Sequence, residues 1–196
     1  MSEIPIKWGI LGCADIAKKI VRAMKLSSNS ELVAIASRDI AKARRFAQQN
    51  ECYDGHPSNG LVQCYGSYEE LLLNEKVQAV YIPLPTTMHL EWVEKAAQSK
   101  KHILLEKPVA VSADEFAQMV TLCKQNNVML MDGTMFMHHT RTASLLRTLF
   151  DPLTGRIKQV RCSFSFNGSS ESFLKGNIRT NASADPLGAL GSINGI

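Results

Sequence analysis

The sequence lacks several features that mark whole classes of protein. No run approaches the roughly 20 apolar residues that a membrane-spanning helix needs, and residues 1–5 do not begin a signal peptide. The 22 basic and 18 acidic residues give a net charge of +4 and are scattered, whereas a nucleic-acid binder usually gathers its basic residues in a stripe. These absences predict a cytoplasmic protein that binds neither membranes nor nucleic acids.

The cysteines and histidines show no spacing typical of a disulfide framework or a metal site. The five cysteines are Cys13, Cys52, Cys64, Cys123 and Cys162. They are odd in number and form no Cys-x-x-Cys pair, so we expect reduced, mostly buried thiols. His138 and His139 are adjacent, but neighbouring histidines do not converge on one ion, and no acidic partner follows at ligand spacing. No metal site is expected.

A strand, a glycine turn and a helix are predicted at the start of the chain. Residues 6–11 are a short apolar run that favours a β-strand, Gly12 interrupts it, and apolar residues then recur at helical spacing from Asp15. Backbone N–H groups at the start of such a helix, together with the helix dipole, can bind pyrophosphate. The cofactor ligands predicted from this turn are Gly12, Cys13, Ala14, Asp15 and Ile16.

This turn departs from the Gly-x-Gly-x-x-Gly pattern of dinucleotide sites. Ala14 and Ala17 occupy the second and third glycine positions. Alanine is an accepted variant at the third position, but at the second its methyl group lies where the backbone approaches phosphate. The motif alone is therefore weak support for a cofactor site. A purely structural strand–helix corner is the alternative.

The end of the second predicted strand indicates which dinucleotide is preferred. Residues 31–37 are apolar on both faces, as a buried parallel strand requires. An NAD-preferring site usually carries an acidic residue at this strand end, but Ser37 and Arg38 stand there. A hydroxyl and a guanidinium suit a 2′-phosphate, so we expect NADP rather than NAD, with Lys42 as a further ligand. Alternatively, Arg38 lies in solvent and Asp39 begins the next helix.

Strand and helix patterns alternate over the first 150 residues, which predicts an α/β fold with a Rossmann-type, doubly wound parallel sheet. Further strands are expected at residues 61–65, 77–82, 102–106 and 128–132, with a polar loop at residues 50–60. Ser67 and Ser112 each begin a capping box at the start of a helix. The second of these helices carries a stripe that we expect to be buried, formed by Phe116, Met119, Val120 and Cys123.

Two loops at the carboxyl ends of predicted strands carry more specific motifs. The fourth strand ends in Pro83-Leu84-Pro85 with His89 beyond it, and the fifth ends in Glu106-Lys107-Pro108. Together with the glycine turn, these motifs resemble the Gfo/Idh/MocA family (glucose-fructose oxidoreductase, inositol dehydrogenase and rhizopine catabolism) over residues 8–190. The first turn and residues 132–139 look most like the plant members of that family.

The resemblance implies an NADP-dependent oxidoreductase that acts on a sugar, polyol or related hydroxy or carbonyl compound. In such enzymes the lysine of Glu-Lys-Pro contacts the reacting oxygen, which would make Lys107 catalytic. Its ammonium group would stabilise alkoxide character on that oxygen. Without this context Lys107 reads as a surface lysine at a strand end. The resemblance also assigns Pro83, Pro85, His89, Glu106 and Lys107 to the cofactor site, and His138, His139 and Arg141 to the substrate pocket.

The resemblance further implies a Rossmann domain at residues 1–150 and the start of a substrate and oligomerisation domain at residues 151–196. We expect a strand at residues 156–166 with no sheet to cover its apolar face. Residues 185–191 resemble the family segment before a helix that bears an aspartate and a proton donor, and neither follows. We therefore expect a truncated chain, monomeric or aggregation-prone, whereas full-length relatives are homo-oligomers. The alternative to an enzyme is a nucleotide-binding or cofactor-sensing module without turnover.

Overall fold

Six parallel strands form one sheet in the computed structural model, which describes residues 4–52, 62–161, 163, 181, 183 and 185–187. The strand order is β3-β2-β1-β4-β5-β6. The strands are β1 (Ile6–Leu11), β2 (Ser30–Ala36), β3 (Gln63–Tyr65), β4 (Ala79–Ile82), β5 (His102–Leu105) and β6 (Leu130–Asp132). This is the strand order of a dinucleotide-binding Rossmann sheet. The expected fold class is confirmed.

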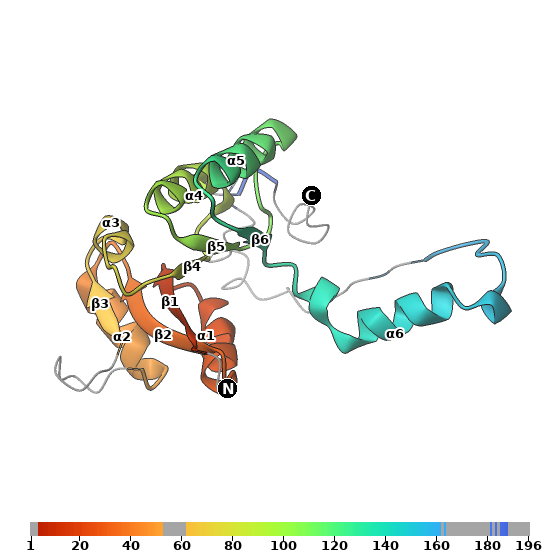
Figure 1. Ribbon diagram of the computed structural model, residues 1–196, viewed down its shortest axis with the longest axis horizontal. Coiled ribbons are helices and arrows are strands. Elements are labelled where there is room, and N and C mark those ends of the chain that lie inside the picture. Colours follow the sequence, from red (N-terminus) through yellow and green to blue (C-terminus); the bar gives the residue numbers. More distant parts are fainter. Residues whose placement is uncertain are drawn as a thin grey trace.

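Helices cover both faces of this sheet (Figure 1). The covering helices are α1 (Ala17–Leu26), α2 (Ile40–Gln49), α3 (Tyr68–Leu72), α4 (His89–Gln98) and α5 (Ala113–Gln125), and a further helix, α6 (Thr140–Leu149), follows them in the chain. Three short 3-10 helices are η1 (Thr86–Met88), η2 (Met135–His138) and η3 (Pro152–Thr154). Helices α1 and α2 share one apolar core with the sheet, whereas α3, α4 and α5 share another.

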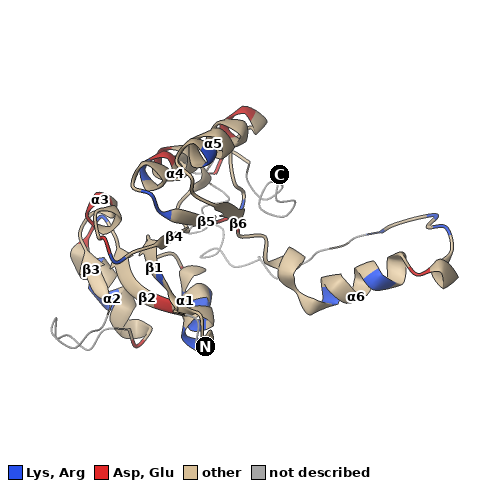
Figure 2. Ribbon diagram, viewed as in Figure 1, with Lys and Arg blue, Asp and Glu red and all other residues tan. Residues whose placement is uncertain are grey.

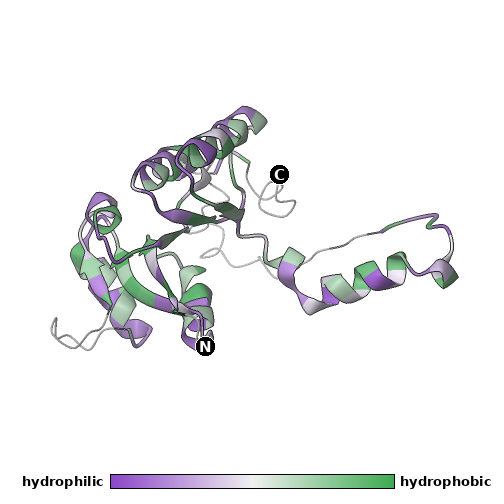
Figure 3. Ribbon diagram, in the orientation of Figure 1, coloured by the Kyte–Doolittle hydropathy of each residue, from purple (hydrophilic) through white to green (hydrophobic). Residues whose placement is uncertain are grey.

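Alternate residues of the central strands enter these two cores. Ile10 and Tyr81 pack with α1 and α2, whereas their neighbours Leu11 and Ile82 pack with α3, α4 and α5. Successive side chains of a strand point to opposite faces, so a parallel sheet covered on both sides needs strands that are apolar throughout. This explains the largely apolar strands at the centre of the molecule (Figure 3).

The helix starts follow local sequence signals. The side chains of Asp39, Ser67 and Ser112 each accept a hydrogen bond from a backbone N–H in the first turn of α2, α3 and α5. Such a cap satisfies one of the N–H groups that a helix leaves unpaired at its start. The two serine caps expected from the sequence are therefore confirmed.

The structure corrects two expectations about the packing. Phe116 was expected in the buried stripe of α5 but is 43% exposed, because Met119 and Cys123, further along the helix, make the buried contacts. Residues 156–161, the first part of an expected strand, are exposed and join no sheet within the described part of the chain. A strand without a neighbour is not stable in water. Residues 53–61, 162, 164–180, 182, 184 and 188–196 lie outside the described residues, and with them Cys162 and most of the second half of the strand expected at residues 156–166.

Helix α6 extends away from the sheet and its covering helices (Figure 1). Several apolar side chains of η2, of this helix and of the residue after it are exposed, including Phe136, Met137, Leu145, Leu146 and Phe150. After α6, residues 151–161 are all exposed. The described chain therefore has a packed Rossmann body, followed by one helix and an extended segment with few contacts.

Limited proteolysis should cut this extended segment first. Trypsin is expected to cleave after Arg156, Lys158 or Arg161, all exposed outside any helix or strand, and to leave the sheet intact, because exposed segments without regular structure are cut preferentially. Mass spectrometry of the early fragments measures this. A variant in which the three residues are replaced by glutamine is the control and should lose the early cut. Early cleavage within the strands would contradict the prediction.

Candidate cofactor site

The turn between β1 and α1 is shaped by Gly12. Gly12 has a φ of +119°, and its N–H donates a 2.9 Å hydrogen bond to the carbonyl of Ala36 on β2. A Cβ at this position would lie 3.0 Å from Cδ2 of Leu84. L-amino acids rarely adopt this backbone conformation. Glycine is therefore favoured here by its backbone conformation, and its lack of a side chain also leaves space for Leu84.

The start of α1 has no side-chain cap, although the N–H groups of Ala17, Lys18 and Lys19 already donate to backbone carbonyls. Its N-cap position is Ile16, no side chain caps the helix, and no acidic residue lies in its first turn. Ala17 N–H donates to the carbonyl of Ala14, and Lys18 N–H to the carbonyl of Asp15. A helix start whose N–H groups are not capped by a side chain attracts phosphate. Basic residues on the exposed side of α1 (Figure 2) add positive charge nearby.

The carboxyl end of β2 brings two basic side chains towards this turn. Arg38 is exposed and its charge acts on the hydroxyl of Tyr68, whereas Lys42, in the first turn of α2, acts on Cys13 and Asp15. The two residues that follow β2 are Ser37 and Arg38, and neither is acidic. The arrangement fits a dianionic phosphate better than a ribose hydroxyl.

Ser37 and Cys13 lie beneath the surface of the turn. Ser37 is only 5% exposed and hydrogen-bonds with Cys13. Burial raises the pKa of the Cys13 thiol to about 11, although Lys42 acts in the opposite direction. Cys13 is therefore a neutral thiol near pH 7. Arg38 and Lys42, rather than Ser37, are the accessible members of the predicted phosphate site.

His89 joins the loop after β4 to the loop after β5. It is 1% exposed, its Nδ1 lies 3.0 Å from the carbonyl oxygen of Val109, and its Nε2 lies 2.9 Å from that of Leu84. Both ring nitrogens face backbone carbonyls inside the protein, and in the neutral ring the one that carries the hydrogen donates. His89 therefore supports the walls of the crevice, and its ring is not presented to a cofactor or to a substrate that needs a proton.

The pKa of His89 makes the stability of the fold depend on pH. Burial lowers this pKa, and it outweighs the backbone carbonyls and the Glu106 carboxylate, which favour the charged ring. The unfolded chain should thus bind a proton near pH 6.5 that the folded chain resists. The free energy of unfolding is expected to fall as the pH drops below about 6.5, by at most about 1.4 kcal/mol per pH unit from this group.

Urea unfolding of the protein and of the His89→Gln variant between pH 5.5 and 8 measures this dependence. The exposed His102, His138 and His139 remain in both proteins, so their contributions cancel in the comparison. The variant should show the shallower loss of stability on acidification. Equal slopes in the two proteins would show that His89 does not resist protonation.

The turn after β5 carries Glu106 and Lys107 to the same edge of the sheet. Glu106 is 7% exposed, and its Oε1 accepts a 2.7 Å hydrogen bond from the hydroxyl of Tyr81. Its Oε2 accepts a 3.1 Å bond from the N–H of Lys107. The Lys107–Pro108 peptide bond is cis. Lys107 itself is partly exposed.

Gly133, after β6, lets a neighbouring strand end approach Glu106. Its N–H donates a 2.7 Å hydrogen bond to the carbonyl of Leu105. A Cβ at this position would lie 3.1 Å from that carbonyl oxygen and 3.3 Å from Oε1 of Glu106. Sequence reasoning missed Tyr81 and Gly133, because neither a tyrosine within an apolar strand nor a lone glycine carries a recognisable motif.

The residues assigned to a substrate pocket follow β6. His138, His139 and Arg141 are all exposed. The Nδ1 of His139 accepts a hydrogen bond from the N–H of Arg141 and caps α6. A hydrogen bond from Thr134 is the largest cause that lowers the pKa of Asp132, at the end of β6. No group of three metal-ligating side chains occurs among the described residues.

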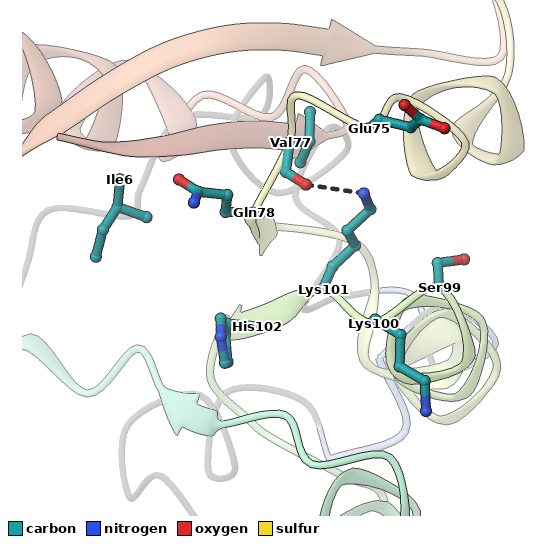
Figure 4. Close-up of a pocket in the computed structure, with 8 residues that line it drawn as sticks. All are labelled: Ile6, Glu75, Val77, Gln78, Ser99, Lys100, Lys101 and His102. Carbon is teal, nitrogen blue, oxygen red and sulfur yellow. Dashed lines mark hydrogen bonds between the residues drawn. The ribbon is translucent and has the colours of Figure 1, made fainter. Parts of the chain in front are cut away.

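The strand ends after β1, β2, β4, β5 and β6 thus assemble most of the predicted site residues at the carboxyl edge of the sheet. A groove of about 530 Å³ lies among the amino ends of the strands instead (Figure 4). There the buried Lys101 donates to the carbonyls of Asn74 and Val77 at 2.9 and 2.8 Å. Ligands of open α/β sheets bind at the carboxyl ends, so this groove is not the cofactor site.

Comparison with known proteins gives a family match that covers all six strands of the sheet. The family model named GFO_IDH_MocA, an oxidoreductase family with an NAD-binding Rossmann fold, matches residues 6–134. In the part of the chain that the structure describes, no helix is long and apolar enough to cross a membrane.

Individual relatives are also oxidoreductases. The chain is 40% identical over 138 residues to a dTDP-3,4-didehydro-2,6-dideoxy-alpha-D-glucose 3-reductase of Saccharopolyspora spinosa, covering 70% of this chain and 39% of that protein. It is 39% identical to D-xylose 1-dehydrogenase (NADP(+)) 2 of Haloferax volcanii, over 81% of this chain and 46% of that protein. The chain spans less than half the length of these relatives.

A solved structure has the same architecture. A variant of KijD10, a 3-ketoreductase from Actinomadura kijaniata crystallised with TDP-benzene and NADP, matches with a TM-score of 0.78 and 31% identity. The match covers 96% of this chain and 54% of that chain.

Proposed function

Because the chain belongs to the Gfo/Idh/MocA oxidoreductase family, with its NAD-binding Rossmann fold, we propose that it binds NADP(H) at the carboxyl edge of its sheet. We further propose that Lys107 takes part in hydride transfer between this cofactor and a sugar, polyol or related carbonyl compound. Arg38 carries the cofactor assignment, because this exposed guanidinium stands two residues beyond the end of β2, with Lys42 in the first turn of α2.

The residues at this edge fit the parts of NADP. Gly12 gives the turn its left-handed backbone conformation, with a φ of +119°, and the pyrophosphate would lie against this turn. The uncapped start of α1 would hold the pyrophosphate, and Arg38 with Lys42 would hold the 2′-phosphate. The names of two relatives support this choice, since one is an NADP(+) dehydrogenase and another was crystallised with NADP.

Lys107 would act on the substrate. When bound, NADP(H) supplies or accepts the hydride. The Lys107 ammonium would donate a hydrogen bond to the reacting oxygen of the substrate and stabilise its alkoxide character. Its backbone N–H is held by the buried Glu106 carboxylate, which limits the movement of the turn. A preorganised cation is worth more to catalysis than a mobile one, because no reorganisation is needed as charge develops.

The substrate class rests on the relatives. Those named above act on a dTDP-linked keto sugar and on D-xylose, so a carbohydrate-like carbonyl compound is proposed here. A cytoplasmic location, expected from the sequence, is proposed as well.

NADPH binding followed by turnover tests this proposal. NADPH fluorescence should show saturable binding, and oxidation of NADPH should then be followed with dTDP-linked keto sugars, or reduction of NADP with D-xylose. Lys107→Met, which keeps the length of the side chain, should retain binding and lose turnover by roughly 10²-fold or more. Absence of NADPH binding would refute the proposal. Binding without turnover in the unaltered chain would contradict the proposed hydride transfer and favour the alternative, a nucleotide-binding module.

A further inference from the structure

Tyr81 lies in the centre of the sheet and carries a hydroxyl that packing does not require. It is fully buried, with its ring in the apolar core beneath α1 and α2. On the neighbouring strands it is paired in register with Ile10 of β1 and Leu104 of β5. A phenylalanine would fill this place without a polar atom to satisfy, whereas a buried hydroxyl is costly unless it is hydrogen-bonded.

The Tyr81 hydroxyl reaches along the sheet to its carboxyl edge. Its partner, Glu106, stands two residues beyond Leu104, the residue paired with Tyr81. Two residues of a strand span roughly 6.6 Å and bring the side chain back to the same face, which a phenol can bridge. The phenol donates, because burial and the charge of Glu106 both raise the pKa of Tyr81.

Glu106 is therefore held from both sides. Its Oε1 accepts from Tyr81 and its Oε2 from the N–H of Lys107. Gly133, just after β6, lies against the same carboxylate, since a Cβ added at Gly133 would lie 3.3 Å from Oε1 of Glu106. Without the phenol, Oε1 would be a buried charged acceptor with a lost donor, which favours rotation of the carboxylate towards water. That rotation would also remove the acceptor of the Lys107 N–H.

We propose that Tyr81 is a positioning residue for the nicotinamide half of the cofactor site: its hydroxyl orients Glu106, and Glu106 orients the turn that carries Lys107. The inference rests on the proposed NADP(H) site. In a Rossmann sheet the first three strands serve one mononucleotide half and the last three serve the other. Tyr81 and Glu106 belong to the second half, whereas Gly12 and Arg38 belong to the first.

This division gives a test that does not depend on turnover. Tyr81→Phe should weaken NADPH binding by roughly tenfold, while 2′,5′-ADP, which contains only the adenosine half of NADP, should bind within about twofold of the unaltered chain. Titration calorimetry measures both ligands, and thermal unfolding shows that the variant is folded. Tyr65→Phe is the matched control. It removes a hydroxyl that contacts Gln63 and Asn74, beside β3, and should leave both affinities unchanged.

Glu106→Gln is a second variant that tests the same contact, and it replaces Tyr81→Phe if that variant does not fold. It keeps the volume of the side chain, but the amide can accept through only one of its two terminal atoms. It should weaken NADPH binding at least as much as Tyr81→Phe does, and the double variant should be no weaker than Glu106→Gln alone, because both changes act through one contact.

Three results would overturn the inference. One is unchanged NADPH affinity in Tyr81→Phe, another is an equal loss of NADPH and 2′,5′-ADP, and the third is additive losses in the double variant. An unaltered chain that binds neither ligand would instead refute the proposed cofactor site itself. One that binds both, with Tyr81→Phe unchanged, would overturn only the role of Tyr81.

Discussion

Replacing Gly12 with valine is expected to weaken NADPH binding by at least about 100-fold, or roughly 2.8 kcal/mol. The backbone at Gly12 has a φ of +119°, and a Cβ there would lie 3.0 Å from Leu84. A β-branched residue cannot adopt this conformation without strain, so the turn would move away from its place before α1. Each charge-assisted hydrogen bond lost between the turn and phosphate is worth about 1.5–3 kcal/mol.

The same change should lower the free energy of unfolding by about 1–3 kcal/mol, the cost of a residue held in a sparsely populated conformation. Urea unfolding and NADPH titration measure the two effects. Gly66→Ala is the matched control, because a Cβ at Gly66 meets only Ile40 Cβ at an ordinary 3.6 Å and its φ is not positive. Tight NADPH binding by a folded Gly12→Val protein would show that the pyrophosphate does not lie against this turn.

Arg38→Ala should weaken NADPH binding by about 10- to 150-fold, which corresponds to 1.5–3 kcal/mol for hydrogen bonds between a guanidinium and a phosphate. NADH lacks the 2′-phosphate, so its affinity should change little. The unaltered chain should therefore prefer NADPH, and the variant should lose most of this preference. Parallel fluorescence titrations with the two nucleotides measure the ratio.

Arg45→Ala is the control for the change in net charge. Arg45 lies on α2, the helix that follows Arg38, and is exposed, with its guanidinium 3.9 Å from Asp39. If general electrostatic attraction were responsible, both variants would lose NADPH affinity to a similar degree. Equal affinity of the unaltered chain for NADPH and NADH would remove the basis for assigning NADP.

The local elements of this fold were predictable because their signals lie between close neighbours in sequence. An apolar run before Gly12, helical spacing after it and a serine ahead of a glutamate each report on the next few residues only. The inward residues of α2 follow such a period, and they are the buried Ala43, Phe46 and Ala47. The alternation of strands and helices, in turn, restricts a chain of this length to a parallel sheet covered on both faces.

The sequence by itself thus determined the element order, the parallel sheet and the edge at which the glycine turn, Arg38 and Lys107 gather. Only the tertiary structure decided that Phe116 is exposed and that His89 faces two carbonyls instead of the crevice. It also joined Tyr81 to Glu106, which are 25 residues apart. Such contacts depend on the register between strands and on how a helix is rotated against the sheet. Both are set by the packing of distant residues, and no local pattern encodes them.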